Sequence, residues 1–324
     1  MMLVLYQIKL KIFMNNQVYI SVIIPVYNSS NSLKKIAALL VDELNMINSS
    51  YEIIFINDAS ADNSYEVLKL LAFNNKDIKV INLTKNFGQD NAIMSGLNNC
   101  CGELIVIMDD DLQHDPKDIS SLIKGLSPSF DVCYGMYEQR KDGFFKSLMS
   151  KFNNMTATII LGKPYKLYLS PFKAFKADIK DEIIKYINPY PYIDGLILRV
   201  TNNINQVKIS HFTRDIGGSG YNFIKSLSVW LNLSTSFSII PLRVSSIIGF
   251  LTSLGSFILS IYFYISYLQG MDPPEGWQST ILIILFLGGI QLMTLGIIGE
   301  YLGRLYLSQS NLPQYSIKEI LNDK

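Results

Sequence analysis

The sequence predicts an α/β protein with a mostly parallel sheet, followed by a C-terminal two-helix transmembrane hairpin. Apolar strand-like runs alternate with helix-like segments over residues 18–125. The run 104–108 is apolar throughout, which is typical of a strand that is buried on both faces. Residues 244–268 and 279–299 contain no charged residue, and each run is long enough to cross a bilayer as a helix.

The composition of the chain narrows the classes of partner and compartment. The 324 residues carry 28 Lys and Arg against 27 Asp and Glu, and the net charge of +1 gives no support for a nucleic-acid partner. The three cysteines are Cys100, Cys101 and Cys133. An odd number with two adjacent is a poor disulfide framework, so a reducing compartment fits better.

Strands and helices are expected to alternate with short turns, which predicts right-handed crossovers between parallel strands. Helical spacing of apolar residues marks the helices, and Ser29 to Asn31 offer capping side chains to the first of them. The expected strands are residues 18–24, 52–56, 78–83, 104–108 and 131–135, and the expected helices are residues 33–46, 61–73, 90–98 and 116–125.

Each of the first four expected strands ends in polar residues. These clusters are Pro25, Tyr27 and Asn28; Asp58; Asn86, Gly88 and Gln89; and Asp109, Asp110, Asp111 and Gln113. The carboxyl ends of parallel strands meet at one edge of a sheet, where ligands bind in open α/β folds. Turns are polar in any case, but four such clusters together predict a nucleotide crevice. There, Asp58 suits hydrogen bonds to a ribose or a base edge.

The acids at the end of the fourth strand predict a metal site. Three adjacent carboxylates repel one another unless a cation compensates them. Alternation along the backbone points Asp109 and Asp111 the same way and Asp110 the other way. A hard divalent ion that also carries phosphates fits this arrangement. The alternative is a solvated acidic turn. The sequence has no GxGxxG after its first strand and no GxxxxGK[ST], so it gives no support for a dinucleotide-dependent oxidoreductase or a P-loop NTPase.

Two segments before the apolar runs have alternative interpretations. Arg214 stands beside the glycine-rich stretch 217–220, which suits capture of a phosphate but also fits a surface turn. Residues 221–243 mix aromatic and aliphatic residues with Lys225 and many Ser and Asn. This mixture suits an amphipathic segment on the membrane surface, although a packed soluble helix would also fit.

The charge of the loops predicts the topology of the hairpin. Residues 269–278 are acidic and lack Lys and Arg, so the positive-inside rule places this loop outside. The protein is therefore expected to be multi-pass in the inner or plasma membrane, with the catalytic domain in the cytoplasm. The expected parts are an N-terminal extension 1–17 with Met14 as the expected true start, a catalytic domain 18–220, a juxtamembrane segment 221–243, a hairpin 244–304 with spans 244–268 and 279–302, and a cytoplasmic tail 305–324.

Taken together, these motifs resemble the family 2 glycosyltransferases with the GT-A fold. More narrowly, the chain resembles the membrane-bound polyisoprenyl-phosphate glycosyltransferases, which include dolichol-phosphate mannose synthases and bacterial bactoprenol glucosyltransferases. The stretches that carry the resemblance are residues 21–28, 57–60, 82–89, 108–113, 214–221, 237–243, 285–291 and 296–304.

The resemblance implies a metal-dependent reaction between two anionic substrates. A sugar would pass from a nucleotide-sugar, expected to be a UDP-sugar, to polyprenyl phosphate at the bilayer. Asp109 and Asp111 would be the DxD motif that holds Mg²⁺ or Mn²⁺, with Gln113 assisting. The residues expected to face the diphosphate or the lipid phosphate are Arg214, Ser219 and Tyr221, and those expected to line the nucleotide site are Pro25, Tyr27 and Asp58. Some relatives are tetramers, so the resemblance also implies a homo-oligomer.

One stretch departs from the family pattern. Related bacterial enzymes carry an Asp-Phe-Arg element whose Asp is a proposed base, and here Pro171 stands where that Asp would be. Asp194 is the expected substitute, and its alternative role is a structural cap in a turn. The expected catalytic residues are therefore Asp109, Asp111, Asp194 and Arg214.

Two other functions compete with this interpretation. One is a family 2 transferase that acts on a glycan hydroxyl, but the two expected spans and the absence of a QxxRW motif argue against a processive enzyme. The other is a non-catalytic membrane protein that binds sugar nucleotides, and the intact Asp109 and Asp111 argue against it.

Overall fold

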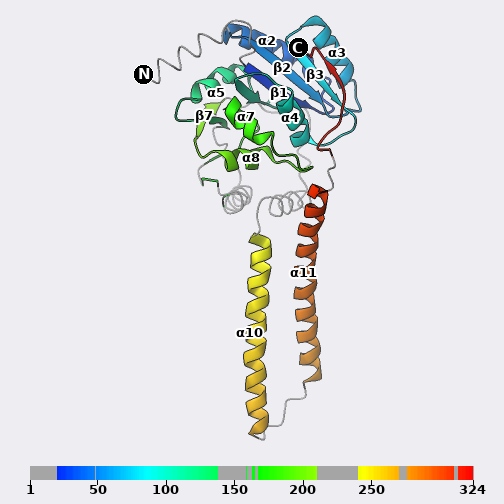
Figure 1. Cartoon of the computed structure of the whole chain (residues 1–324), viewed down its shortest axis with the longest axis vertical. Helices are drawn as coiled ribbons and strands as arrows, with labels where there is room; N and C mark the ends of the chain where they lie inside the picture. The colour runs from blue at the N-terminus through cyan, green and yellow to red at the C-terminus, as the bar shows by residue number, and fades with distance from the viewer. Residues whose placement is uncertain are drawn as a thin grey trace. The chain divides into compact units, whose positions relative to one another are not determined.

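The computed structural model describes residues 20–47, 49–137, 158, 163–164, 167–209, 240–269, 276–309 and 313–323. The chain divides into two compact units (Figure 1). The sheet unit comprises Met1–Ser219 and Leu312–Lys324, and the helical unit comprises Gly220–Asn311. Each unit is described separately below.

The sheet unit is built on an eight-stranded sheet with the strand order β7-β5-β6-β4-β1-β2-β3-β8. The strands are β1 (Ile20–Val26), β2 (Tyr51–Asn57), β3 (Ile78–Leu83), β4 (Leu104–Ile107), β5 (Val132–Tyr137), β6 (Lys173–Lys176), β7 (Ile204–Ile209) and β8 (Ile317–Leu321). The pairs β1–β2, β1–β4, β2–β3 and β5–β7 are parallel, and β6 and β8 pair antiparallel to their neighbours. The predicted mostly parallel α/β sheet is confirmed.

Helices cover both faces of the sheet because successive strand residues point to opposite sides. Val22 and Ile24 of β1 belong to one buried cluster with α2 (Leu33–Ile47), α3 (Ser64–Asn74) and α5 (Ile119–Gly125). Ile23 belongs to the other cluster with α4 (Gln89–Asn98), α7 (Ala177–Ile183) and α8 (Ile193–Val200). This gives three layers, and a short 3₁₀ helix (Pro116–Asp118) precedes α5.

Strand β1 continues beyond the proline at which the sequence analysis ended it. Pro25 pairs with Ile56 of β2, and β1 ends at Val26. The carbonyl of Ile23 accepts from Met108 N at 3.2 Å, so the odd-numbered backbone groups of β1 face β4. Pro25 lies beyond the last pair of β1 with β4, which joins Ile23 to Ile107, so its missing N–H falls outside the paired register of these two strands.

The C-terminal residues return to the sheet, which the sequence analysis did not predict. It assigned them to a tail, whereas β8 pairs antiparallel with β3. Asn322, with φ of 55°, donates from Nδ2 to the carbonyl oxygens of Ala72, Asn75 and Ile78 at 2.7, 3.1 and 2.9 Å. The amide side chain of Asn322 therefore fixes the end of this segment by hydrogen bonds to three backbone carbonyl groups.

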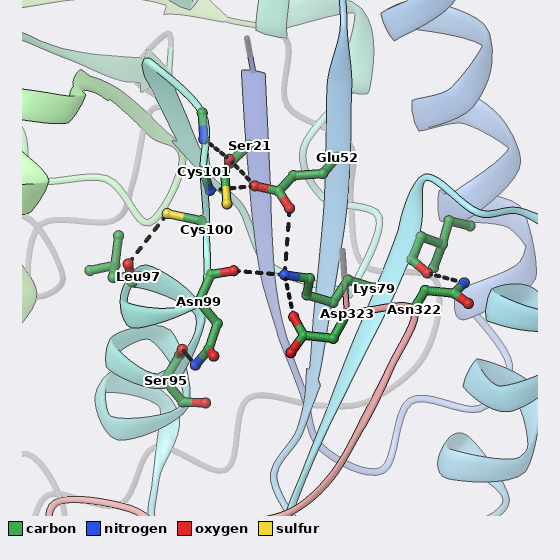
Figure 2. A network of polar contacts seen from close by, with 12 residues as sticks. Ser21, Glu52, Lys79, Ser95, Leu97, Asn99, Cys100, Cys101, Asn322 and Asp323 are labelled. Carbon is green, nitrogen blue, oxygen red and sulfur yellow. Dashed lines mark hydrogen bonds and ion pairs between the residues drawn. The ribbon is translucent and has the colours of Figure 1, made fainter. Parts of the chain in front are cut away.

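A buried lysine connects this segment to the centre of the sheet (Figure 2). Lys79 Nζ lies 3.0 Å from Asp323 Oδ1 and 3.9 Å from Glu52 Oε2, and it donates to the carbonyl of Asn99 at 3.0 Å. Oε1 of Glu52 accepts from Ser21 Oγ at 2.6 Å and from Cys101 N at 2.7 Å. The network lies at the amino ends of the parallel strands, because Ser21, Glu52 and Lys79 are the second residues of β1, β2 and β3.

The helical unit contains α10 (Ile240–Leu268) and α11 (Trp277–Gln309). These helices cover the two predicted spans. Within the part of the chain that the structure describes, one segment, Phe286–Leu307 of α11, is long and apolar enough to cross a membrane. The span at 244–268, and with it the hairpin, stays a prediction. The N-terminal extension and residues 221–239 of the juxtamembrane segment lie outside the described residues.

Candidate active site

The polar clusters predicted for one sheet edge lie together because the strand ends are in register. Val26 at the end of β1 pairs with Asn57 at the end of β2, and Asn57 pairs with Asn82 of β3. Nδ2 of Asn57 donates to Oδ1 of Asn82 at 2.8 Å. Met108 continues the pairing of β4 with β1, so the acids from Asp109 onward begin a turn at this same edge. We call residues Asp109–Gln113 the acid turn.

The three carboxylates of the acid turn contact different partners. Oδ1 of Asp109 accepts from Gln89 Nε2 at 2.8 Å, at the start of α4. Oδ2 of Asp110 accepts from Tyr27 N at 3.4 Å, in the loop after β1. The Asp110 carbonyl also accepts from Ser32 Oγ at 2.7 Å, which joins the acid turn to the residue just before α2.

Asp111 is oriented by its neighbour in the same turn. Its two carboxylate oxygens accept from the backbone N and from Nε2 of Gln113, at 3.1 and 2.7 Å. Leu112 between them has φ of 59°, a left-handed conformation that tightens the turn. Gln113 thus orients the Asp111 carboxylate by donating to it, and would support a metal held by that carboxylate without needing to contact the metal itself.

The acid turn carries negative charge that the protein itself compensates only in part. Burial, followed by the charges of Asp111 and Asp110, raises the pKa of Asp109 to about 6. Lys173 and the bond from Gln89 act in the opposite direction. Burial also raises the pKa of Asp110. Carboxylates with raised pKa values in a crevice indicate a functional site, because evolution tolerates such a cost mainly where charge is needed.

These residues fit a divalent cation that also binds a substrate. Within the described ranges, no three His, Cys, Asp or Glu side chains converge to cage a metal ion by themselves. Mg²⁺ in nucleotide sites is typically held by one or two carboxylates together with phosphate oxygens and water. Asp109 and Asp111 supply such a pair. Burial, followed by the charges of Asp111 and Asp110, raises the pKa of Asp109, and a bound cation would favour the charged form of this carboxylate.

Asp58 organises a loop of the crevice rather than standing open to it. Its side chain is buried, and its two oxygens accept from Phe87 N at 2.7 Å and Gly88 N at 2.9 Å. Gly88 has φ of 90°, a conformation that residues with a side chain rarely adopt. The carboxylate therefore holds the turn from which Gln89 reaches Asp109. The sequence placed Asp58 in the crevice but gave no indication of these two donors.

The loop after β1 is joined to the loop after β2. Asn28, with φ of 55°, donates from its backbone N to Ser60 Oγ at 3.1 Å, and its Oδ1 accepts from Ala61 N at 2.8 Å. Tyr27 keeps 52% of its surface exposed, so its ring is available to a ligand. Asn86 is also exposed.

A second polar cluster lies beside the acid turn. Oδ1 of Asp194, in the first turn of α8, accepts from Tyr134 OH at 2.9 Å and forms an ion pair with Lys173. Lys173 Nζ also lies 5.4 Å from the centre of the Tyr134 ring. Burial, followed by the charge of Asp194, raises the pKa of Asp90 to about 6.

Lys173, Tyr134 and Asp90 were missed as site residues by the sequence analysis. A lysine in a four-residue strand gives no local signal of burial, and only the pairing of β6 with β4 and β5 brings it here. His114 was also missed. It is buried next to Gln113, where it is hydrogen-bonded to Tyr137 and packs on the Phe172 ring at 5.0 Å. The predicted Arg214, Ser219 and Tyr221 lie outside the described residues.

Comparison with known proteins identifies the family. The profile described as Glycosyl transferase family 2 matches residues 21–184, which is half of the chain and contains the acid turn and all the clusters of the crevice. The chain is a family 2 glycosyltransferase. The match ends before Asp194, so this residue is not covered by it.

Full-length relatives of this glycosyltransferase extend the similarity beyond the crevice. The chain is 32% identical over 304 residues to a proposed glycosyltransferase, CsbB, of Bacillus subtilis (strain 168), with 93% of this chain and 91% of the relative covered. It is 28% identical over 308 residues to the undecaprenyl-phosphate 4-deoxy-4-formamido-L-arabinose transferase of Proteus mirabilis (strain HI4320), with 94% of both chains covered.

Solved structures support the GT-A fold. Glucosyl-3-phosphoglycerate synthase of Mycobacterium tuberculosis in complex with Mn²⁺, UDP-glucose and phosphoglyceric acid is similar to the glycosyltransferase with a TM-score of 0.50 and 13% identity, over 71% of this chain and 81% of that chain. The UDP complex gives a TM-score of 0.50 with 14% identity, over 71% and 82%. At this identity the likeness concerns the fold alone.

Proposed function

We propose that this glycosyltransferase moves a sugar from a nucleotide-sugar, a UDP-sugar in the simplest case, to polyprenyl phosphate at the cytoplasmic face of a membrane. The acid turn carries the proposal, because its carboxylates, whose charge the protein compensates only in part, follow β4 at the edge where β1 and β2 also end. The choice of acceptor is supported by the undecaprenyl-phosphate transferase of Proteus mirabilis, to which the chain is similar over 94% of its length.

Different residues of the site would bind different parts of the donor. Asp109 and Asp111 would hold Mg²⁺ or Mn²⁺, which when bound neutralises charge on the departing nucleoside diphosphate. Gln89 and Gln113 orient these two carboxylates through the bonds at 2.8 and 2.7 Å. Asp58 fixes the turn at Gly88, and the exposed ring of Tyr27 offers a surface to the nucleotide. The residues proposed for the phosphates of donor and acceptor are Arg214, Ser219 and Tyr221.

The acceptor reduces the need for a strong general base. A phosphate monoester has a second pKa of about 6, so it is mostly dianionic at neutral pH and can attack without losing a proton first. A sugar hydroxyl would need a base. Pro171 replaces the expected Asp, and Asp194 is held by Tyr134 and Lys173. Catalysis would then come mainly from positioning and from stabilisation of the leaving group.

The test uses membranes that contain the full chain, a panel of nucleotide-sugars and polyprenyl phosphate, with mass spectrometry of the lipid. Asp109→Asn and Asp111→Asn should each lower the formation of lipid-linked sugar by about 100-fold or more, since each removes a charged ligand. Asp178→Asn is the matched control, because this exposed acid lies at the start of α7. Metal-independent turnover at the rate of the unchanged protein in either variant would refute the proposal, as would transfer only to a glycan hydroxyl.

The membrane part of the proposal concerns α10 and α11. Large apolar side chains are exposed on both helices, including Phe257 at 63% and Leu292 at 72%, and a bilayer would cover them. We place both helices in the membrane as a hairpin with the loop 269–278 outside. A cysteine introduced at Gly276 should then react with an impermeant maleimide on intact cells. The exposed Cys101 of the sheet unit should react only after permeabilisation, and the reverse order would contradict this topology.

A further inference from the structure

Lys173 is a buried cation at the edge of the acid turn. It is the first residue of β6, where it pairs with Ile107 of β4 on one side and with Tyr134 of β5 on the other. Ile107 stands two residues before Asp109, so the strand register places this lysine next to the start of the acid turn. Only 4% of its surface is exposed. Burial of an ammonium group is costly, so the site must supply compensating partners.

The partners of Lys173 fix a carboxylate. Its ammonium group forms an ion pair with Asp194, whose side chain is 14% exposed. Tyr134 OH donates to the same oxygen, Oδ1, at 2.9 Å, and Lys173 also lies over the Tyr134 ring. Two donors from neighbouring strands therefore set the position of one acid on α8. Removal of one member of such a buried pair leaves the other uncompensated.

The charge of Lys173 extends beyond this ion pair. The strand register places Lys173 opposite Ile107, two residues before Asp109, and its positive charge lowers the pKa of Asp90 against the larger effect of burial. This edge carries two acids besides the three of the acid turn, namely Asp90 and Asp194. Both proposed substrates are anionic as well, and a cation at this place reduces the repulsion that they meet.

We propose that Lys173 is a positioning residue for sugar transfer, which fixes Asp194 beside the acid turn and limits the negative charge that the turn presents to its substrates. The role rests on the proposed function for its substrates, but its electrostatic part is independent of them. Lys173 acts as a counter-ion of the acid turn and so competes with a free divalent cation for its negative charge. It thereby favours binding of a cation that is already bound to the diphosphate of the donor. Its removal should therefore strengthen the binding of free metal while it weakens the use of the donor.

The experiment measures Mn²⁺ binding to the full chain in detergent micelles without donor, by electron paramagnetic resonance of the free ion. Lys173→Met should tighten Mn²⁺ binding roughly three- to tenfold, because a neighbouring positive charge is lost. Asp194→Asn should weaken it by a similar factor. The double variant K173M/D194N should return near to the unchanged protein, because its net charge is restored. In transfer assays with saturating Mn²⁺, K173M should raise the KM for the donor, and Lys173→Arg should stay within about twofold.

Lys176→Met is the matched control. Lys176 is the last residue of the same strand and is ion-paired with Asp131 at 2.8 Å, far along β6 from the acid turn. It should leave Mn²⁺ binding unchanged. If K173M weakened Mn²⁺ binding or left it unchanged, or if K176M had the same effect, the assignment would be overturned. If K173M failed to fold, unchanged Mn²⁺ binding in D194N would overturn it. The protein could also fail to make any lipid-linked sugar while K173M tightened Mn²⁺ binding and D194N weakened it. That result would support the electrostatic role of Lys173 and reject the proposed acceptor.

Discussion

The buried lysine of Figure 2 gives the sharpest prediction about stability. Lys79→Met removes the hydrogen bond to the Asn99 carbonyl and both ion pairs, and leaves Glu52 buried without a cation. Loss of one partner from a buried ion pair costs about 3–5 kcal/mol. Glu52 keeps its donors Ser21 and Cys101, so we expect the lower end, about 3 kcal/mol. Asp323→Asn should cost less than about 1 kcal/mol, because the Asp323 side chain is 61% exposed.

The assay is urea unfolding of the full chain in detergent micelles, read by labelling of buried thiols. Burial raises the pKa of Cys100 to about 12 and that of Cys133 to about 11, so both thiols stay protonated and protected until the sheet unit opens. With a urea dependence of about 2–3 kcal/mol per molar, K79M should lower the midpoint by about 1 M or slightly more.

The control for this assay is an exposed ion pair. Lys69→Met breaks the contact of Lys69 with Glu66, in which both side chains are at least 40% exposed. It should cost less than about 0.5 kcal/mol. A shift below about 0.3 M for K79M would refute the reasoning that burial makes the network costly to break, and so would equal shifts for K79M and D323N.

Three further predictions concern the crevice and its support. In EDTA, the raised pKa of Asp109 means that the folded protein binds this proton more tightly than the unfolded chain, so stability falls as the pH rises from 3.8 to about 6. Asp109→Asn should abolish this loss and raise the thermal midpoint at neutral pH by about 2–4 °C in differential scanning fluorimetry. Gly88→Ala forces a residue with a side chain into a φ of 90°, so it should lower the free energy of unfolding by about 1 kcal/mol. Donor titration should show an affinity about fivefold lower, and unchanged affinity would contradict the role given to this turn. Gly102→Ala would place Cβ 2.5 Å from Ser21 Oγ and 2.6 Å from its backbone N, so urea unfolding should show a loss of about 2 kcal/mol; an unchanged midpoint would refute this.

The parallel half of the sheet could be predicted because its strands are rich in apolar and β-branched residues. Residues 78–83 were predicted with the bounds that β3 has, and the run 104–108 contains β4. Strand β8 has the sequence Ile-Lys-Glu-Ile-Leu, whose charges are typical of an edge strand and equally of a loop. Its partner β3 lies more than 230 residues earlier, so no local pattern could indicate the pairing.

The crevice could be located from the sequence, but the partners of its residues could not. Strand ends and the acids at 109–111 follow from local pattern alone. That Asp58 binds two backbone N–H groups depends on the conformation of a turn 30 residues away. That Lys173 reaches Asp194 depends on β6 running antiparallel between β4 and β5. Both are long-range contacts, and residue type alone does not distinguish a ligand-binding acid from one that is already engaged.

The return of residues 317–323 to the sheet fixes an order of assembly during translation. These residues follow α11 in the chain, so they leave the ribosome after every residue of that apolar helix. Until then the outer edge of β3 has no partner, and Lys79 lacks the aspartate that lies 3.0 Å from it in the finished protein. During translation, the sheet therefore remains without its edge strand β8 while the apolar helices are being synthesised.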